Sequence, residues 1–421
     1  MVYKYADWQH NRIVTNERNG NTVDSSLPDI RKGENMSFFW PGNRNKQLPN
    51  IYDRGTMADI VKYFYQDGEL LNFMISGFAD KKMPECYELF DEVREYAIAQ
   101  YPVLTLYRDD SQENILEFEP FYGMTDIQII TSVRQLAIAL DYTVMPKLER
   151  VIRAHMQILK ELDMSVTLTG FCYLNTYTDI EEFHDNIMAL PCGEKKAAGI
   201  WADLGVDDTS DNNQFDLFRS VIDNFAQEMQ ENGWKHVGEA DDHNCLMAIK
   251  HKESITLYIN EIHSDLLFTY LAEELKACGN REYVLLIDDL QINSENFISY
   301  LCTVKENCHI GITSKNIVSQ LGKDNFLELC EKMDYFVFFK HGTAKTAEIF
   351  AELMGCSDYM KVETSQKYTR RAFDLFYHDR QDDIRYSTEN RYRVMPEDIM
   401  ELGLEQAIIF DTVIDEIIYF N

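Results

Sequence analysis

The chain has 421 residues, of which 45% are hydrophobic and 26% charged, and this composition excludes a disordered or fibrous protein. Its 71 acidic and 40 basic residues give a net charge of −31, which disfavours strong general binding to nucleic acid or anionic lipid. No apolar run reaches the roughly 18 residues of a membrane span, and the nine cysteines form no CxxC pair. We therefore expect a cytoplasmic globular protein with reduced thiols.

Short runs dense in aromatic and β-branched residues predict the strands. Several are apolar on both faces, which is typical of a parallel sheet covered by helices. In chain order the runs are 36–40, 70–76, 103–108, 115–119, 254–260, 282–288, 309–314 and 335–339. Two late runs, AIIFDT and DEIIYF, predict a closing hairpin or edge pair.

Amphipathic segments with readable ends alternate with these strands and predict helices. Ser264 can cap a helix that runs to Cys278 and stops at Gly279, and Thr343 can cap one that ends at Gly355. From Val144 to about Trp234 the pattern is almost entirely helical. The sequence therefore predicts an α/β fold with an all-helical insertion, whose acidic 205–213 piece forms an exposed loop.

Two acids, Asp288 and Asp289, end the apolar run YVLLI. In nucleoside triphosphatases the first such acid holds Mg²⁺ and the second orients water. Acids also end buried strands simply where the chain reaches solvent, so both interpretations stay open. The sequence contains no GxxxxGK[ST] phosphate loop, and the nearest match, Trp40 to Gln47, keeps only Lys46 and has Gln47 in place of the hydroxyl.

The C-terminal half resembles the type IV coupling proteins of conjugation and type IV secretion, which are FtsK/HerA-like hexameric ATPases. The resemblance covers about Ile255 to Asn421 and rests on VLLIDDLQI, HIGITSKNIVSQLG, the segment from Cys330 to Gly355, and RYRVMPEDIMELGLEQAIIF. It implies a RecA-like domain of mostly parallel strands flanked by helices. The predicted division is an N-terminal arm (1–34), the RecA-like domain (35–143 and 236–421) and the all-helical insertion (144–235).

Three departures from the family pattern concern the same function. The phosphate loop is degenerate at Lys46 and Gln47, Asp289 stands where the family usually has a catalytic Glu, and Asn316 stands at the sensor position. Together they predict a pseudo-ATPase, a catalytically inactive binding or assembly component with no required cofactor. The alternatives are an active NTPase that uses ATP and Mg²⁺ with an atypical loop, and an acidic adaptor that docks protein substrates without nucleotide.

Two other clusters have structural as well as functional interpretations. His236, Glu239, Asp241, Asp242, His243 and Cys245 do not have zinc-site spacing, so we predict no metal there. Between Lys367 and Arg393, seven basic and five acidic residues are interleaved with aromatics. This mixture fits either a salt-bridged strand pair or a single-strand contact through Arg370, Arg371 and Arg391.

We expect partners among other secretion or conjugation components, weak or no binding of nucleic acid, and no direct membrane insertion. A subunit without a phosphate loop lacks the ligand that usually joins ring neighbours, so we expect a monomer or small oligomer when it is alone.

Overall fold

A computed structural model describes residues 65–66, 69–70, 72–77, 93–108, 115–206, 213–236, 243–260, 264–289, 291–292, 294–304, 307–315, 317–341, 343–369, 379–403, 406–413 and 415–420. The chain divides into two compact units. The larger is Phe64–Val337, and the smaller consists of Met1–Tyr63 with Phe338–Asn421. The predicted strand 36–40 lies outside the described residues.

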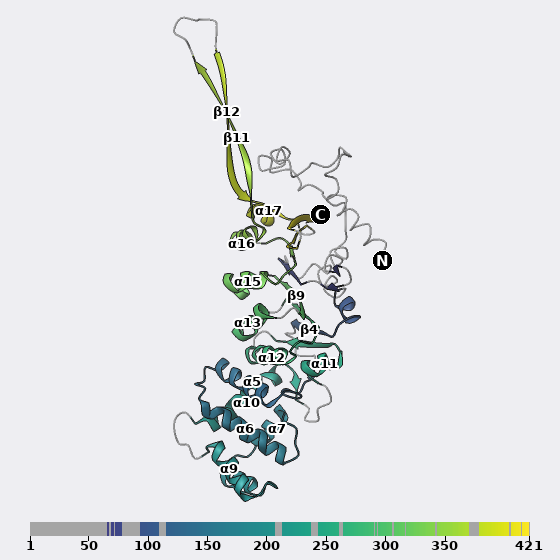
Figure 1. The fold of residues 1–421 in the computed structure, drawn as a ribbon, viewed down its shortest axis with the longest axis vertical. Helices are drawn as coiled ribbons and strands as arrows, with labels where there is room; N and C mark the ends of the chain where they lie inside the picture. The colour runs from purple at the N-terminus through teal and green to yellow at the C-terminus, as the bar shows by residue number, and fades with distance from the viewer. Residues whose placement is uncertain are drawn as a thin grey trace. The chain divides into compact units, whose positions relative to one another are not determined.

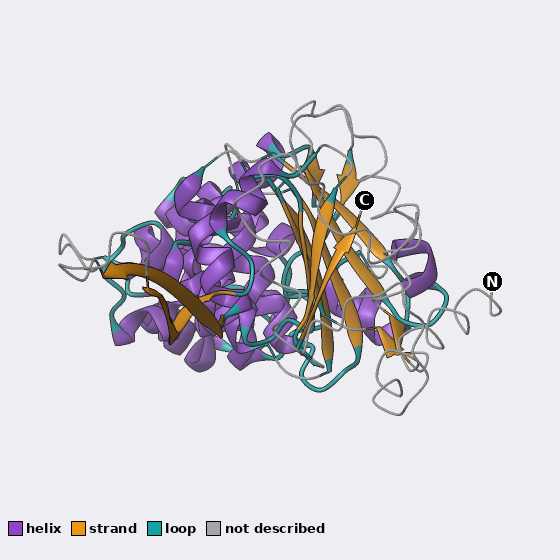
Figure 2. Cartoon of the chain, turned by 90° about the horizontal axis from the view of Figure 1, so that it is seen from above, coloured by secondary structure: helices purple, strands orange, loops and turns teal. Residues whose placement is uncertain are grey.

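A mostly parallel sheet forms the centre of the larger unit (Figure 2). Six consecutive strands of this sheet have the order β10-β3-β9-β8-β4-β7, and β3–β9, β9–β8, β8–β4 and β4–β7 all pair in parallel. The strands are β3 (Phe73–Ser76), β4 (Val103–Arg108), β7 (Ile255–Ile259), β8 (Tyr283–Asp288), β9 (Cys308–Ser314) and β10 (Tyr335–Phe338). The predicted α/β class is confirmed, since these strands are the doubly apolar runs of the sequence.

Gly311 of β9 permits close packing between β3 and β8. Its Cα faces the ring of Phe73 and the side chain of Leu286, which are both fully buried. A Cβ at Gly311 would lie 2.3 Å from Cζ of Phe73 and 2.8 Å from Cδ2 of Leu286, well inside van der Waals contact. The Phe73 ring therefore fills the space that a side chain at this position would need.

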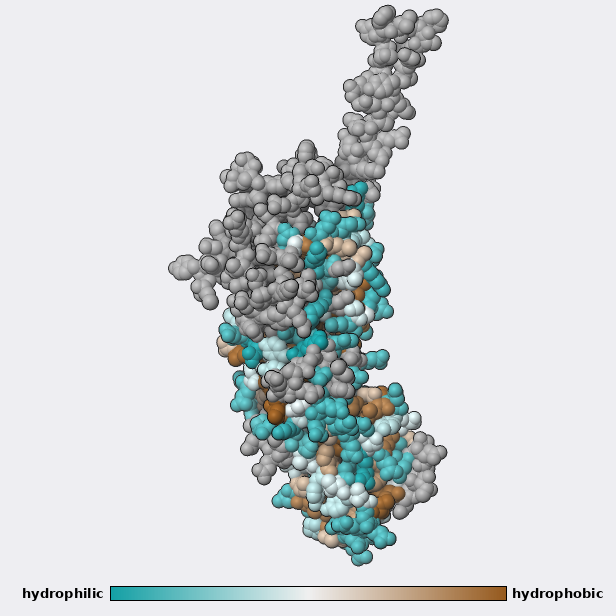
Figure 3. Space-filling view, turned by 180° about the vertical axis from the view of Figure 1, so that it is seen from behind, coloured by the Kyte–Doolittle hydropathy of each residue, from teal (hydrophilic) through white to brown (hydrophobic). Residues whose placement is uncertain are grey.

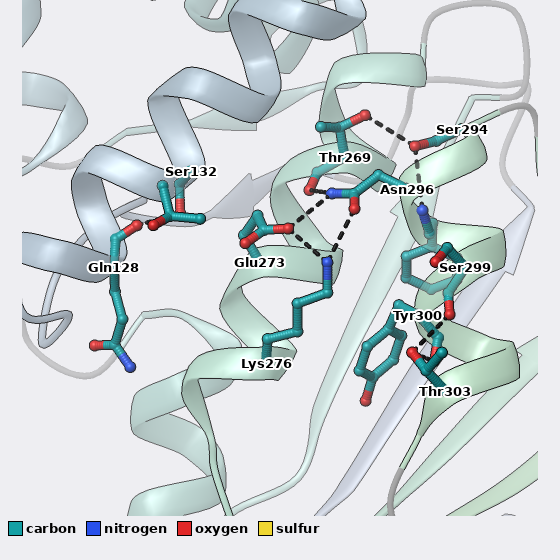
Figure 4. Close-up of polar contacts among 12 residues, drawn as sticks. Gln128, Ser132, Thr269, Glu273, Lys276, Ser294, Asn296, Ser299, Tyr300 and Thr303 are labelled. Atoms are coloured by element: carbon teal, nitrogen blue, oxygen red, sulfur yellow. Dashed lines mark hydrogen bonds and ion pairs between the residues drawn. The ribbon is translucent and has the colours of Figure 1, made fainter. Parts of the chain in front are cut away.

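Helices α12 (Asp265–Ala277), α13 (Glu295–Thr303) and α15 (Lys323–Cys330) follow one another across the sheet, each in contact with the next (Figure 1). The short α14 (Ile317–Leu321) precedes α15. Polar contacts link α12 to α13 (Figure 4): Lys276 donates from Nζ to Glu273 at 2.6 Å and to Asn296 at 2.9 Å. Ser294 caps α13 by accepting the N–H of Phe297, and its hydroxyl also pairs with Thr269 at 2.8 Å.

The predicted ends of α12 are right, and so is the position of Ser264 at its start. Ser264 occupies the N-cap position without a side-chain hydrogen bond to the helix. The helix stops at Ala277, and Gly279 follows with a φ of +70°, the left-handed backbone that favours glycine.

Helices dominate the segment between β5 (Leu116–Glu117) and β6 (Trp234–Lys235), which pair in parallel. They are α5 (Asp126–Ala139), α6 (Pro146–Glu161), α7 (Leu168–Asn175), α8 (Ile180–Met188), α9 (Glu194–Leu204) and α10 (Gln214–Glu231). The predicted helical character is thus present from α6 to α10, and α5 precedes the predicted range. The boundaries of the three predicted domains stay a prediction.

Aromatic side chains fill the core of this helical segment. Phe121 lies against Phe171, Phe225 and Tyr270, so rings from α7, α10 and α12 meet there. His155 of α6 lies within 4.2 Å of Phe218 between ring centroids, and its Nδ1 bonds the carbonyl of Val151. Burial lowers the pKa of His155 to about 4, so this histidine is a neutral core residue at physiological pH.

The remaining described elements are small. β1 (Tyr65–Gln66) pairs with β2 (Glu69–Leu70), and α11 (Cys245–His251) packs against α12. None of the helices among the described residues has the length and apolar content that crossing a bilayer requires. Hydrophilic residues cover most of the described surface seen in Figure 3, with small apolar areas between them.

The smaller unit contains the predicted closing hairpin, since β13 (Ala407–Asp411) and β14 (Glu416–Phe420) pair antiparallel. Before it come α16 (Ala344–Met354) and α17 (Pro396–Glu401). Arg393 donates to the carbonyl of Met354 and forms an ion pair with Asp415, so it joins the end of α16 to the β13–β14 turn. Thr343 is the N-cap residue of α16, as predicted, but its side chain makes no cap hydrogen bond.

A second hairpin in this unit is formed by β11 (Cys356–Thr369) and β12 (Asp379–Tyr392), which pair over their full length. Residues 367–369 and 379–392 of the 367–393 segment thus belong to this strand pair.

Candidate functional site

The strand order predicts where this sheet binds a ligand. From β3 the chain continues to β4, on the far side of β9 and β8, whereas from β9 it continues to β10, on the opposite side of β3. In open α/β sheets, ligands bind outside the carboxyl ends of two adjacent strands whose connections leave in opposite directions. Here those strands are β3 and β9, so the candidate site lies beyond Ser76 and Ser314.

Small polar residues end both strands at this point. The N–H of Gly77 donates to the carbonyl of Ser314 at 3.2 Å, and Gly77 has a φ of +93°. Ser314 donates from Oγ to Gln320 at 3.0 Å. Ser76 is fully buried, and its Oγ has no hydrogen-bond partner in the described part of the chain. Because an unsatisfied buried hydroxyl costs about 1–3 kcal/mol, it requires an explanation, and a binding site supplies one.

The two predicted acids follow β8, the strand next to β9. Thr313 donates from Oγ1 to Oδ1 of Asp288 at 2.6 Å. The N–H of Asp289 donates to the carbonyl and to Oγ1 of the same Thr313, both at 3.0 Å. Asp289 has a φ of +45°, a left-handed conformation that Asp tolerates better than most residues. Thr313 therefore fixes the position of both acids.

Lys315 engages both carboxylate oxygens of Asp289. Its main-chain N–H donates to Oδ1 at 3.2 Å, and its ammonium forms a short ion pair with Oδ2. The side chain of Asp289 is 11% exposed and that of Lys315 is 37% exposed. The acid is thus nearly buried and paired with a partly exposed lysine that directly follows the adjacent strand β9.

The structure brings together only part of the predicted site. Asp288 and Asp289 lie beside the β3–β9 crevice, whereas Lys46, Gln47, Asn316, Arg370 and Arg371 lie outside the described residues. Arg391 is in β12 of the other unit, opposite Ser357 in the strand register. The functional roles of all these residues stay predictions.

Sequence reasoning did not select Ser76, Thr313 or Lys315 as site residues. Each ends or follows a predicted strand, but which strand ends are neighbours depends on the sheet order. That order is set by long-range pairing and leaves no local sequence signal.

A buried acid lies apart from the crevice, where α12 meets α11. Glu274 accepts the N–H of Leu246 at 3.2 Å, and its Oε2 has no hydrogen-bond partner among the described residues. Burial raises the pKa of Glu274 to about 8. Burial likewise raises the pKa of the neighbouring thiols Cys245 and Cys278, so none of the three groups is an activated nucleophile.

No family model and no curated protein matches the chain. Solved structures do. The bacterial conjugative coupling protein TrwBdeltaN70, in its unbound monoclinic form, is similar at 10% identity over 87% of this chain and 90% of that chain, with a TM-score of 0.49. Plasmid coupling protein TrwB in complex with ADP and Mg²⁺ is similar at 11% identity over 83% and 84%, with a TM-score of 0.45. VirB4 of Thermoanaerobacter pseudethanolicus is similar at 11% identity over 83% and 88%, with a TM-score of 0.44.

Coupling proteins, the family that the C-terminal motifs resemble, are thus among the proteins of similar structure. At 10–11% identity this similarity concerns the fold, and the nucleotides named above are ligands of those proteins.

Proposed function

We propose that this chain is a coupling-ATPase-like component of a conjugative or type IV secretion apparatus, and that it acts in binding or assembly without hydrolysing nucleotide. Two features support the proposal. The motifs from Ile255 onward resemble the coupling-protein family, and the acids of the VLLIDD motif lie beside the crevice where an open α/β sheet binds its ligand.

The proposal that the chain is catalytically inactive rests on the ion pair between Lys315 and Asp289. A water-orienting carboxylate must have an oxygen free to accept a hydrogen bond from the attacking water. In this chain Lys315 engages both oxygens of Asp289. Lys315 therefore competes with an attacking water for both oxygens of this carboxylate, and this competition supports the inactive form of the proposal.

Nucleotide turnover tests the proposal directly. We expect no Mg²⁺-dependent ATP hydrolysis above the protein-free rate, and no change in Asp288→Asn. ATP binding measured by calorimetry should be weaker than about 10 μM, a level at which the binding free energy reaches roughly −7 kcal/mol. Steady hydrolysis that Asp288→Asn abolishes would contradict the proposal and favour the active NTPase.

Self-association tests the assembly part. Each copy carries a net charge of −31, and copies repel one another over the roughly 8 Å Debye length at physiological salt. We propose that the isolated protein is a monomer or small oligomer, recruited to a basic partner from the same apparatus through acidic surface. Light scattering that shows a stable hexamer without nucleotide would exclude this.

Nucleic-acid contact, if present, should be limited to the basic 367–393 segment. We expect no strong duplex binding at physiological salt, because the net charge opposes it. Fluorescence anisotropy with labelled single strands checks the assignment. Binding that Arg370→Ala with Arg371→Ala leaves unchanged would show that the contact lies elsewhere.

A further inference from the structure

We infer that two copies of this chain associate through an uncharged block on one face of the β11–β12 hairpin. The block consists of Met360, Val362, Thr364, Ile384, Tyr386 and Thr388. The inference goes beyond the proposed function and does not depend on whether the chain hydrolyses nucleotide. It rests on the isolation of the hairpin as a sheet, on the different composition of its two faces, and on its small share of the negative charge.

The hairpin is long for a sheet of two strands. Among the described residues, β11 and β12 pair with each other over fourteen residues and with no third strand. Figure 1 shows them extending away from α16 and α17 of the same unit. A two-stranded sheet is only marginally stable in water and becomes more stable when a further layer packs on one face. A partner that covers one face would therefore stabilise this hairpin.

The strand register divides the hairpin into two faces. Directly opposite residues of an antiparallel pair lie on the same face, together with every second residue along each strand. Three consecutive pairs on one face contain no charged residue: Met360 with Thr388, Val362 with Tyr386, and Thr364 with Ile384. The alternating pairs on the other face are Lys361 with Ser387, Glu363 with Arg385, and Ser365 with Asp383. The uncharged block is therefore the part of the hairpin that favours removal from water.

The base of the hairpin is fixed within its own unit. The N–H of Arg393 donates to the carbonyl of Gly355 at 2.9 Å, next to the first cross-strand pair of the hairpin. The guanidinium of Arg393 bonds the carbonyl of Met354 and pairs with Asp415. Both strands thus start from one anchored point, already in register.

The charge distribution favours a second copy as the partner. The two strands contain five basic and six acidic residues, whereas the whole chain has 40 and 71. Copies with a net charge of −31 repel one another, so they approach most easily where each is close to neutral. A basic partner would instead be attracted to the acidic remainder of the chain. An uncharged block can also meet its own copy across a twofold axis without bringing like charges together.

The size of the face limits the strength of this contact. Fourteen residues at about 3.4 Å each, in a ribbon about 10 Å wide, give a face of roughly 500 Å². Two such faces cover about 1,000 Å² together, which is at the low end of specific interfaces. We therefore expect a weak dimer, with a Kd on the order of 10 to 100 μM.

Sedimentation velocity of the full chain, at concentrations up to about 200 μM, measures the dimer. The dimer should be stronger in 1 M than in 0.1 M NaCl, because salt screens the repulsion between copies and does not weaken apolar contact. Thr364→Asp should weaken it at least tenfold. Ser365→Asp is the matched control, because it adds the same charge to the neighbouring residue on the opposite face, and it should leave the dimer unchanged.

A chain that stays monomeric at every concentration in 1 M NaCl would overturn the inference and favour a different protein as the partner of the block. Equal weakening by Thr364→Asp and Ser365→Asp would also overturn it. So would a dimer that salt weakens, since that result indicates contact between charged faces. If Thr364→Asp does not give the wild-type circular dichroism spectrum, the double variant Val362→Thr with Ile384→Thr replaces it, because it keeps β-branched residues in both strands and adds no charge. Loss of the dimer is expected there too, and an unchanged dimer would refute the assignment.

Discussion

Replacing Glu274 with Gln should stabilise the protein at alkaline pH and have little effect in mild acid. The carboxyl is fully buried, and burial raises its pKa to about 8 in the folded chain from 4.5. The folded protein therefore keeps a proton that the unfolded chain releases above pH 4.5. The stability associated with Glu274 is complete below pH 4.5 and is lost as the pH rises through 8.

The size of this loss follows from the distance between the two values, 8 − 4.5 = 3.5 pH units. At about 1.4 kcal/mol per unit, the wild type loses roughly 5 kcal/mol of unfolding free energy across this range through Glu274. Gln has nearly the same shape, stays neutral, and can still accept the N–H of Leu246. Its advantage over Glu should therefore grow from about zero at pH 5 to several kcal/mol near pH 8.

The assay is urea unfolding of both proteins at pH 5.0, 6.5 and 8.0, compared by midpoint and slope. Glu228 of α10, whose pKa burial raises to about 7, contributes its own pH dependence to both proteins, so only the difference between them reports Glu274. Glu273→Gln is a matched control on the same helix, because it breaks the ion pair with Lys276 and leaves Glu274 unchanged. A constant difference between wild type and Glu274→Gln at all three pH values would refute the reasoning.

Two other substitutions follow from the core. Gly311→Ala should destabilise the protein by roughly 1–3 kcal/mol, because the new Cβ would overlap the Phe73 ring. Thermal unfolding measures this loss of stability. An unchanged melting temperature would show that the ring can move aside. His155→Phe should make the protein less sensitive to acid. Burial lowers the pKa of His155 from 6.5 to about 4. The free energy of unfolding of the wild type therefore falls by about 3 kcal/mol as the pH drops from 6.5 to 4. Urea midpoints at pH 7 and pH 4.5 check this, and equal acid sensitivity in both proteins would assign it to other groups.

Local sequence patterns predicted individual elements well. The run VLTLYR is β4 to the residue, and AIIFDT with DEIIYF forms the closing hairpin, because apolar β-branched residues at strand spacing have few other ways to be buried. The β11–β12 hairpin was less readable, since polar residues occupy both of its strands and no apolar run marks them. Its pairing appeared in the sequence only as one of two interpretations of the 367–393 segment.

Of the candidate site, the two acids could be predicted from the sequence, but their hydrogen-bond partners could not. Two acids after an apolar run are visible in the sequence, and Asp288 and Asp289 do end β8. Their partners Thr313 and Lys315 lie some 25 residues further along the chain and become neighbours only because β9 pairs with β8 in parallel. Side-chain bonds at helix starts were equally hidden, because Ser264 has the right residue type and position but makes no cap bond.

The helical segment leaves and rejoins the rest of its unit at neighbouring points, because the N–H of Leu116 bonds the carbonyl of Gly233, and that of Phe118 bonds the carbonyl of Lys235. Adjacent ends of this kind allow one domain to be inserted into another without disturbing the fold of the second. The packing argues against free removal, however. The hydroxyl of Tyr270 on α12 accepts the N–H of Phe121 at 2.8 Å, and its ring lies against Phe225 of α10. Removing the segment would leave that tyrosine exposed and its hydroxyl without this donor. The ends of the segment thus lie close enough for it to be an insertion, but its core is continuous with the core of the rest of the unit.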